Sequence, residues 1–146
     1  MFQMTERRPY RQIVERLQSA GLRPTQQRMA LARVLFEGGD RHVTAEQLHS
    51  EVQAARRPVS LATVYNTLNQ FTRAGLLREV VVGAGRSYFD TNVANHHHFF
   101  HSGSGELTDI DGASIRVEGL PEPPDGAAIE RVDIVIRLAD GADREG

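Results

Sequence analysis

The apolar residues of this chain change their spacing near Gly75, and this change limits the possible folds more than any other feature. Before Gly75 they recur every three or four positions, as on one face of an α-helix, and after it they tend to alternate, as in a β-strand. Helical periodicity followed by strand periodicity is typical of proteins in which helices and sheets occupy separate regions. We therefore expect an α+β fold.

The first half of the chain is expected to contain four helices. The first covers roughly Tyr10 to Ala20, and the second follows Thr25, a residue type that caps helix N-termini. The third begins at Thr44-Ala45-Glu46-Gln47, the signature of a capping box. The fourth runs from Ser60 to Ala74 and ends before Gly75, which can adopt the left-handed conformation that terminates helices. The apolar face of the fourth helix consists of Leu61, Val64, Leu68 and Phe71.

Two strands follow the fourth helix and are expected to form a hairpin. Leu76 to Val82 alternates as one strand, Gly83-Ala84-Gly85 makes the turn, and Arg86 to Asp90 is the returning strand. Helices followed by such a hairpin are typical of a winged helix-turn-helix, so residues 1–90 are interpreted as an N-terminal domain of this kind. The helix from Ser60 to Ala74 would then enter the major groove of DNA.

The polar face of that helix and the arginines of the first half are the candidates for DNA binding. We expect Tyr65 to contact a base or a sugar, with Thr63 and Asn66 beside it. The arginines available for phosphate contacts are Arg23, Arg28, Arg56 and Arg57. Residues 1–75 hold 11 arginines and 6 acidic residues, and residues 76–146 hold 6 arginines and 13 acidic residues, so the two halves are expected to meet different partners. Taken alone, the helix is equally compatible with an ordinary amphipathic helix whose polar face is solvated.

Residues 91–146 are expected to form a second, smaller domain. Strands are predicted from Glu106 to Ile110 and from Ile129 to Leu138, with a proline-rich segment between them. The apolar face of the second strand consists of Ile129, Val132, Ile134, Ile136 and Leu138. Two strands are not stable alone in water, so a second copy of the same segment is the simplest partner. We therefore predict a small α/β dimerisation domain and a homodimer.

A histidine cluster opens this second domain and holds four of the six histidines. Alternation along an extended segment places His96 and His98 on one side and His97 on the other. Asp90 and Asp109 can add carboxylate oxygens, which gives a mixed nitrogen and oxygen ligand set suited to Zn, Mn or Fe(II). The alternative interpretation is an exposed polar loop.

The absence of cysteine restricts this site further. Without cysteine there are no disulfides and no thiolate zinc sites, so imidazole and carboxylate groups must hold any metal. His42 stands apart from the cluster, in the DNA-binding half. Joined to the ligands of the second domain, it would fix the angle between the domains and couple metal binding to DNA binding. His49 and His101 are expected not to be ligands.

Several segments together resemble the ferric uptake regulator (Fur) family. They are Gly21-Leu22-Arg23-Pro24-Thr25-Gln26-Gln27-Arg28, His42-Val43-Thr44-Ala45-Glu46, Leu61-Ala62-Thr63-Val64-Tyr65-Asn66-Thr67-Leu68, and Tyr88-Phe89-Asp90 with the histidine run after it. The resemblance covers roughly residues 10–138. Within the family, the chain is most similar to the Irr branch, the iron response regulators.

The resemblance implies a dimer with a hinge just after the hairpin, and a recognition helix that contains Tyr65. It implies a regulatory metal site at His42, Asp90, His96 and His98, with Asp109 as an optional fifth ligand. The triple histidine is implicated in haem binding in the Irr branch, and here it would be His96, His97 and His98. Haem or a haem-biosynthesis enzyme would then be a partner, and control of iron uptake and haem synthesis genes would follow.

The chain departs from the family pattern in two ways. Family members commonly hold a structural zinc in two Cys-x-x-Cys pairs, but here His101 and Ser104 occupy the first pair and no second pair exists. No structural zinc held by four cysteines is therefore expected. The Cys-Pro haem motif of some Irr proteins is also absent from Thr5 to Arg16, so haem sensing would depend on histidines alone.

These observations predict an iron-responsive transcription regulator and not an enzyme, with a double-stranded DNA operator as partner and metal or haem as signal. A composition of 40% hydrophobic and 25% charged residues, with no long apolar run, predicts a cytoplasmic protein that does not contact membranes. Two alternatives stand beside this function. One is a winged-helix repressor that senses no metal. The other is a small metallohydrolase, although the sequence lacks the His-Glu-x-x-His spacing of a common zinc hydrolase motif.

Overall fold

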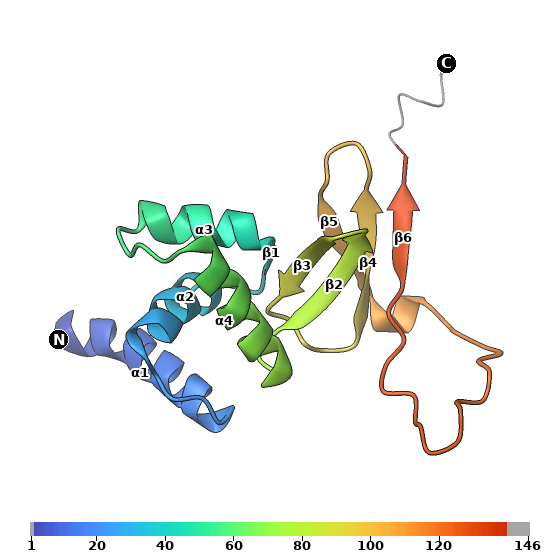
Figure 1. The fold of residues 1–146 in the computed structure, drawn as a ribbon, viewed down its shortest axis with the longest axis horizontal. Coiled ribbons are helices and arrows are strands. Elements are labelled where there is room, and N and C mark those ends of the chain that lie inside the picture. The colour runs from blue at the N-terminus through green and yellow to red at the C-terminus, as the bar shows by residue number, and fades with distance from the viewer. Residues whose placement is uncertain (1, 140–146) are drawn as a thin grey trace. The chain divides into compact units, whose positions relative to one another are not determined.

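The computed structural model describes the backbone of residues 2–139 and the side chains of residues 10–139 (Figure 1). The chain divides into two compact units, Met1–Val93 and Ala94–Gly146. No helix among the described residues is long and apolar enough to cross a membrane.

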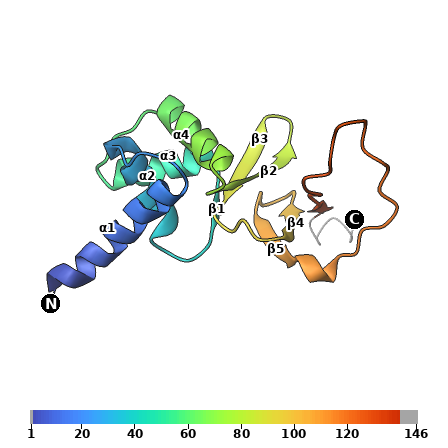
Figure 2. The ribbon, with the colours of Figure 1, turned by 90° about the horizontal axis from the view of Figure 1, so that it is seen from below.

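Four α-helices lie in the described part of the N-terminal unit, as predicted. They are α1 (Phe2–Ser19), α2 (Gln26–Phe36), α3 (Ala45–Ala54) and α4 (Leu61–Arg73). Figure 2 shows α2, α3 and α4 gathered together while α1 extends beyond them. The prediction that the first helix begins at Tyr10 is wrong, because α1 begins at Phe2. The apolar pattern that located this helix involves only its last turns and carries no information about where it starts.

The ends of the helices follow from the residues that flank them. Thr25 and Ser60 accept hydrogen bonds from the third backbone N–H groups of α2 and α4, which satisfies donors that have no partner within the helix. The predicted capping box of α3 is present, with both reciprocal bonds between Thr44 and Gln47. Gly75 follows the last residues of α4 with a φ of 82°, in the left-handed region that glycine adopts without a steric cost.

Arg56 takes this left-handed position after α3, with a φ of 59°. The N–H of Arg56 bonds to the carbonyl of Gln53 at 3.0 Å, and the N–H of Arg57 bonds to the carbonyl of Val52 at 3.0 Å. This pair of bonds is the Schellman motif, in which glycine is the usual residue. Here an arginine is held in that conformation.

The core of the N-terminal unit lies between the helices. Its fully buried side chains include Leu17, Leu31, Leu35, Leu48, Leu68 and Phe71. Three of the four residues predicted on the apolar face of α4 are buried. Leu61 is 37% exposed, so the prediction that it belongs to the buried face is wrong. It is the first residue of α4, and the buried residues of this helix begin at Val64.

A three-stranded sheet completes this unit, in the order β1-β3-β2. β2 (Arg78–Gly83) and β3 (Arg86–Asp90) form the predicted antiparallel hairpin. β1 (His42–Val43) pairs with β3 and was missed, because two residues are too few to show an alternating pattern. The helices and hairpin have the architecture of a winged helix.

The C-terminal unit contains a second sheet, in the order β5-β4-β6. β4 (His96–His101) pairs antiparallel with β5 (Leu107–Asp111) and parallel with β6 (Val135–Leu138). The histidine cluster is therefore the central strand of a sheet and not a polar loop. Among residues 94–139, the only helical segment is the 3-10 turn Gly112–Ser114, and Figure 1 shows a long irregular loop between this turn and β6.

The prediction of one continuous strand from Ile129 to Leu138 is wrong in its first half. β6 begins at Val135, which lies opposite His98. At this register, the residues before 133 lie opposite residues that precede β4. They have no neighbouring strand to pair with.

Candidate metal centre and DNA-binding surface

Three potential metal ligands converge on one face of the C-terminal sheet. His96 and His98 lie two residues apart on β4, and Asp109 is the direct cross-strand partner of His98 on β5. The two imidazole rings have centroids 4.5 Å apart. The Nε2 atoms of His96 and His98 lie 3.8 Å and 3.5 Å from Oδ1 of Asp109. All three residues offer ligand atoms within 4.8 Å of one another.

A backbone contact orients His96 for this arrangement. Its Nδ1 lies 2.6 Å from the carbonyl oxygen of Ala94. A carbonyl only accepts hydrogen bonds, so Nδ1 carries the proton, and Nε2 of the neutral ring keeps the lone pair that a metal needs. Histidine ligands in proteins are commonly oriented in this way by a bond from the other ring nitrogen.

The donor set fits a divalent transition metal. Two imidazole nitrogens and one carboxylate oxygen suit Zn, Mn or Fe, and no cysteine is present in the chain to favour a thiolate-bound metal. His96 and His98 are buried while the Asp109 side chain is 51% exposed, which leaves the carboxylate accessible from solvent.

His97 lies on the opposite face of β4, as its position in the strand requires. Its Nδ1 accepts a hydrogen bond from the N–H of Ile134 at 3.2 Å. The three consecutive histidines therefore cannot all face one ion or one haem iron. His101 contacts Thr108, with its Nε2 3.2 Å from the threonine hydroxyl.

His42 and Asp90 belong to the N-terminal unit and are brought together there. They are direct partners in the pairing of β1 with β3. Asp90 is 1% exposed, and its carboxylate accepts a hydrogen bond from the N–H of Asn92 at 2.9 Å. The ring of His42 lies edge-on to Tyr88, with centroids 6.0 Å apart. Each unit thus gathers its own share of the predicted ligands.

The polar face of α4 is the second candidate site. Tyr65 and Asn66 are exposed, and Thr63 is partly buried. The hydroxyl of Thr63 accepts a hydrogen bond from the hydroxyl of Ser60, the capping residue of α4, at 3.0 Å. The exposed side chains therefore stand on a helix whose N-terminus is fixed and whose other face is buried.

Among the arginines predicted to bind phosphates, Arg28 makes hydrogen bonds to other residues of the chain. Its Nε and Nη2 donate to the side-chain oxygen of Gln70 at 3.3 Å and 3.2 Å, and its Nη1 donates to the carbonyl of Arg23 at 3.0 Å. Arg28 on α2 therefore braces α4. Arg23, Arg56 and Arg57 are exposed.

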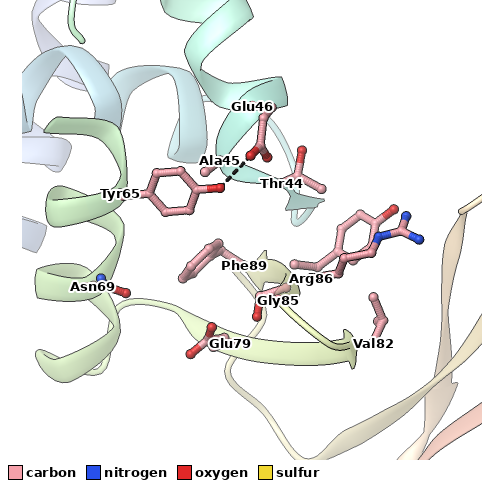
Figure 3. A pocket seen from close by; sticks show the side chains of 12 residues that line it. Thr44, Ala45, Glu46, Tyr65, Asn69, Glu79, Val82, Gly85, Arg86 and Phe89 are labelled. Carbon is pink, nitrogen blue, oxygen red and sulfur yellow. Dashed lines mark hydrogen bonds between the residues drawn. The ribbon is translucent and has the colours of Figure 1, made fainter. Parts of the chain in front are cut away.

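Sequence reasoning missed the residue that contacts Tyr65. The hydroxyl of Tyr65 donates to Oε1 of Glu46, in the first turn of α3, at 2.5 Å (Figure 3). This hydrogen bond lowers the pKa of Glu46, and the backbone of Glu46 lowers it further. The same bond raises the pKa of the Tyr65 hydroxyl. The two residues are far apart in sequence, so no local pattern connects them. In the sequence, Glu46 stands out only as part of the capping box that begins at Thr44.

A cavity of about 520 Å³ adjoins this pair, between α3, α4 and the hairpin. The charged residues that line it are Glu46, Glu79 and Arg86. Figure 3 shows Tyr65 and Asn69 reaching this cavity from α4. Two carboxylates and one guanidinium group therefore lie beside a helix expected to approach DNA.

Comparisons with known proteins agree with this architecture. The model of the ferric uptake regulator family matches residues 19–132. The peroxide-responsive repressor PerR of Staphylococcus epidermidis is 34% identical over 94 residues, which cover 64% of this chain and 62% of that repressor.

Among solved structures, the ferric uptake regulator of Pseudomonas aeruginosa with manganese has a TM-score of 0.66 and 25% identity, and the match covers 87% of this chain and 96% of that one. The Vibrio cholerae ferric uptake regulator has a TM-score of 0.67 at 22% identity, over 87% of this chain and 98% of that chain, which is a likeness of fold.

Proposed function

The chain belongs to the ferric uptake regulator family, and from that premise we propose that it is a transcription regulator whose binding to a double-stranded DNA operator responds to a divalent metal. Members of this family are transcription regulators and not enzymes, which argues against the metallohydrolase alternative. Such a regulator would work in the cytoplasm, with the DNA.

The observation that carries the metal response is the convergence of His96, His98 and Asp109 on one sheet face. We propose that these side chains bind Fe, Mn or Zn, and that His42 and Asp90 of the N-terminal unit complete the ligand set. The orientation of His96 by Ala94 and the pairing of His42 with Asp90 support this assignment. The bound ion would then link the N-terminal unit to the C-terminal unit through its ligands.

Ligands from both units would make metal affinity depend on the arrangement of the units, because only one arrangement satisfies all the ligand bonds. Thermodynamic linkage then requires that DNA binding, which also selects an arrangement, changes with metal occupancy. DNA contacts are proposed for Tyr65, Thr63 and Asn66, with phosphates bound by Arg23, Arg28, Arg56 and Arg57.

We also propose a homodimer formed by the C-terminal unit. Several large apolar side chains of this unit are exposed in the single chain, namely Val117, Leu120, Ile129 and Ile136. Their burial against a second copy would stabilise the dimer at about 25 cal/mol for each Å² of apolar surface removed from water. Two copies would also present two recognition helices to the operator.

Control of iron uptake and haem synthesis genes, as in the Irr branch, is the finer proposal. Haem sensing would have to use His96 and His98, because His97 lies on the other face and is bonded to Ile134. The curated relative is named a peroxide-responsive repressor. Iron, haem and peroxide are therefore the signals that an experiment must separate.

The test is to titrate the purified chain with Mn(II), Zn(II), Fe(II) without oxygen, and haem, and to follow DNA binding by fluorescence anisotropy. Metal binding tighter than micromolar, about −8 kcal/mol, is expected. It should be lost in the double variant His96→Ala, His98→Ala and weakened in Asp109→Asn, whose exposed side chain can be replaced without disturbing the core. His49→Ala on α3 is the matched control and should behave as the wild type.

The outcomes separate the alternatives. Full metal and haem responses in the double variant would overturn the sensor assignment. An absence of binding below micromolar concentrations, in a protein that still binds DNA, would favour the repressor that senses no metal. Loss of DNA binding only after peroxide treatment of the metal-loaded protein would make peroxide the signal.

A further inference from the structure

The Glu46 carboxylate lies on the surface proposed to meet DNA, where a negative charge opposes binding. We propose that Glu46 is a positioning residue for sequence recognition: it orients the Tyr65 phenol and engages its hydroxyl proton, so that Tyr65 reads a base and does not bind a phosphate. This inference rests on the DNA-binding function proposed above.

Glu46 is not needed to cap its own helix. The capping box of α3 is already complete, with Thr44 accepting from the N–H of Gln47 at 3.1 Å and Gln47 accepting from the N–H of Thr44 at 2.9 Å. The side chain of Glu46 instead reaches α4 and accepts the Tyr65 hydroxyl at 2.5 Å. Figure 3 shows the phenol pointing along this bond. The contact therefore fixes a side chain of the recognition helix from a neighbouring helix.

The bond determines what Tyr65 can offer to DNA. A phenol has one proton to donate, and here the proton is directed to Glu46. A phosphate oxygen only accepts hydrogen bonds, so Tyr65 cannot bind a phosphate without leaving Glu46. The lone pairs of the hydroxyl and the face of the ring stay available. These suit an exocyclic amino group of adenine or cytosine, or the methyl group of thymine, in the major groove.

The charges around Tyr65 also disfavour contact with a phosphate. The Tyr65 bond lowers the pKa of the Glu46 carboxyl, and the backbone of Glu46 lowers it further. Glu46 also lies in the first turn of α3, where the positive end of the helix dipole favours a negative charge. Glu79 adds a second carboxylate to the same cavity, which Arg86 lines as the one basic residue among the described lining residues. Phosphates are therefore repelled from the immediate surroundings of Tyr65, while a base edge, which carries no net charge, is not.

The experiment begins with a pool of random DNA duplexes from which the full-length wild-type protein, saturated with Mn(II), selects its preferred sequence. Binding to the selected duplex and to a scrambled duplex is then measured for Glu46→Ala, Glu46→Gln and Tyr65→Phe. Glu79→Gln is the matched control, because it removes the same charge from the same cavity while leaving the acceptor of the Tyr65 hydroxyl in place. Each variant also undergoes its own selection, and thermal unfolding confirms that it is folded.

We expect Glu46→Ala to lower the ratio of selected to scrambled affinity by about three- to tenfold, and to lose base preference at the same positions as Tyr65→Phe. Glu46→Gln should retain most of the ratio, because its amide oxygen still accepts the hydroxyl proton. All three substitutions of an acidic residue should strengthen binding to the scrambled duplex to a similar degree, since each removes one negative charge.

Equal ratios and preferences for Glu46→Ala and Glu79→Gln would overturn the inference, because charge alone would then explain the effect. Loss of preference at positions that differ from those of Tyr65→Phe would also overturn it. A wild-type protein that enriches no sequence would refute the proposed DNA-binding function, and this inference with it.

Discussion

Replacing Arg56 by glycine should make the N-terminal unit more stable, although the change removes a large side chain. Arg56 ends α3 with a φ of 59°. For a residue with a Cβ, this left-handed conformation costs about 1–2 kcal/mol. Glycine avoids that cost but gives the unfolded chain extra freedom worth about 0.4–1 kcal/mol. The difference predicts that Arg56→Gly raises the free energy of unfolding by about 0.5–1 kcal/mol.

For a unit of this size, such a gain corresponds to an increase in Tm of about 2–8 °C, measured by circular dichroism. Arg57→Gly is the matched control, because Arg57 is the next residue, is also exposed and does not have a positive φ. It should be neutral or destabilising. A Tm for Arg56→Gly at or below that of Arg57→Gly would refute the reasoning.

The same substitution should weaken DNA binding while it stabilises the fold, because it removes a cation proposed to contact phosphate. The slope of log affinity against log salt concentration should become shallower by about one for each bound protomer. The opposite signs of the two effects exclude unfolding as the cause of weaker binding.

Three other substitutions test the packing and the charges described above. Phe71→Ala, in the centre of the helical core, should lower the free energy of unfolding by about 3–5 kcal/mol in urea denaturation, and a loss below about 1 kcal/mol would contradict its burial. Gly112→Ala should destabilise the C-terminal unit in the same assay, because a Cβ there would lie 2.6 Å from the backbone oxygen of Asn95, which cannot move aside cheaply. Tyr65→Phe should change how stability depends on pH. The hydrogen bond from the Tyr65 hydroxyl lowers the folded-state pKa of Glu46 from 4.5. This bond therefore stabilises the protein fully above about pH 4.5, and its contribution is lost as pH falls through the folded-state pKa. The variant should therefore be less stable than the wild type at pH 7 and approach it in acid, and a constant difference across pH would contradict this assignment.

Local signals predicted the helices and the hairpin well, because each depends on residues close together in sequence. Thr25, Thr44 and Ser60 lie where helix caps are required, and all three cap helices. The alternation of His96 and His98 likewise placed them on one face, and the cross-strand position of Asp109 brought the third group to the same face.

Features that depend on distant partners were not predictable in this way. β1 exists because His42 and Val43 pair with β3, and β6 is confined to the four residues that pair with β4. The bond between Glu46 and Tyr65 joins residues on different helices. Propensity and periodicity describe a segment by itself, so they contain no information about which other segment it meets.

The pairing of β4 with β5 also determines where this protein can change in length. A single residue inserted between His96 and His98, or a slip of one position in their pairing with β5, would turn one set of side chains to the other face and present His97 beside Asp109. The irregular loop between Ser114 and Val135 contains no strand, so an added or removed residue there does not turn side chains from one sheet face to the other. Evolutionary insertions and deletions should therefore accumulate in that loop and be rejected from the two strands, because the residue spacing in these strands keeps the proposed metal ligands on one face.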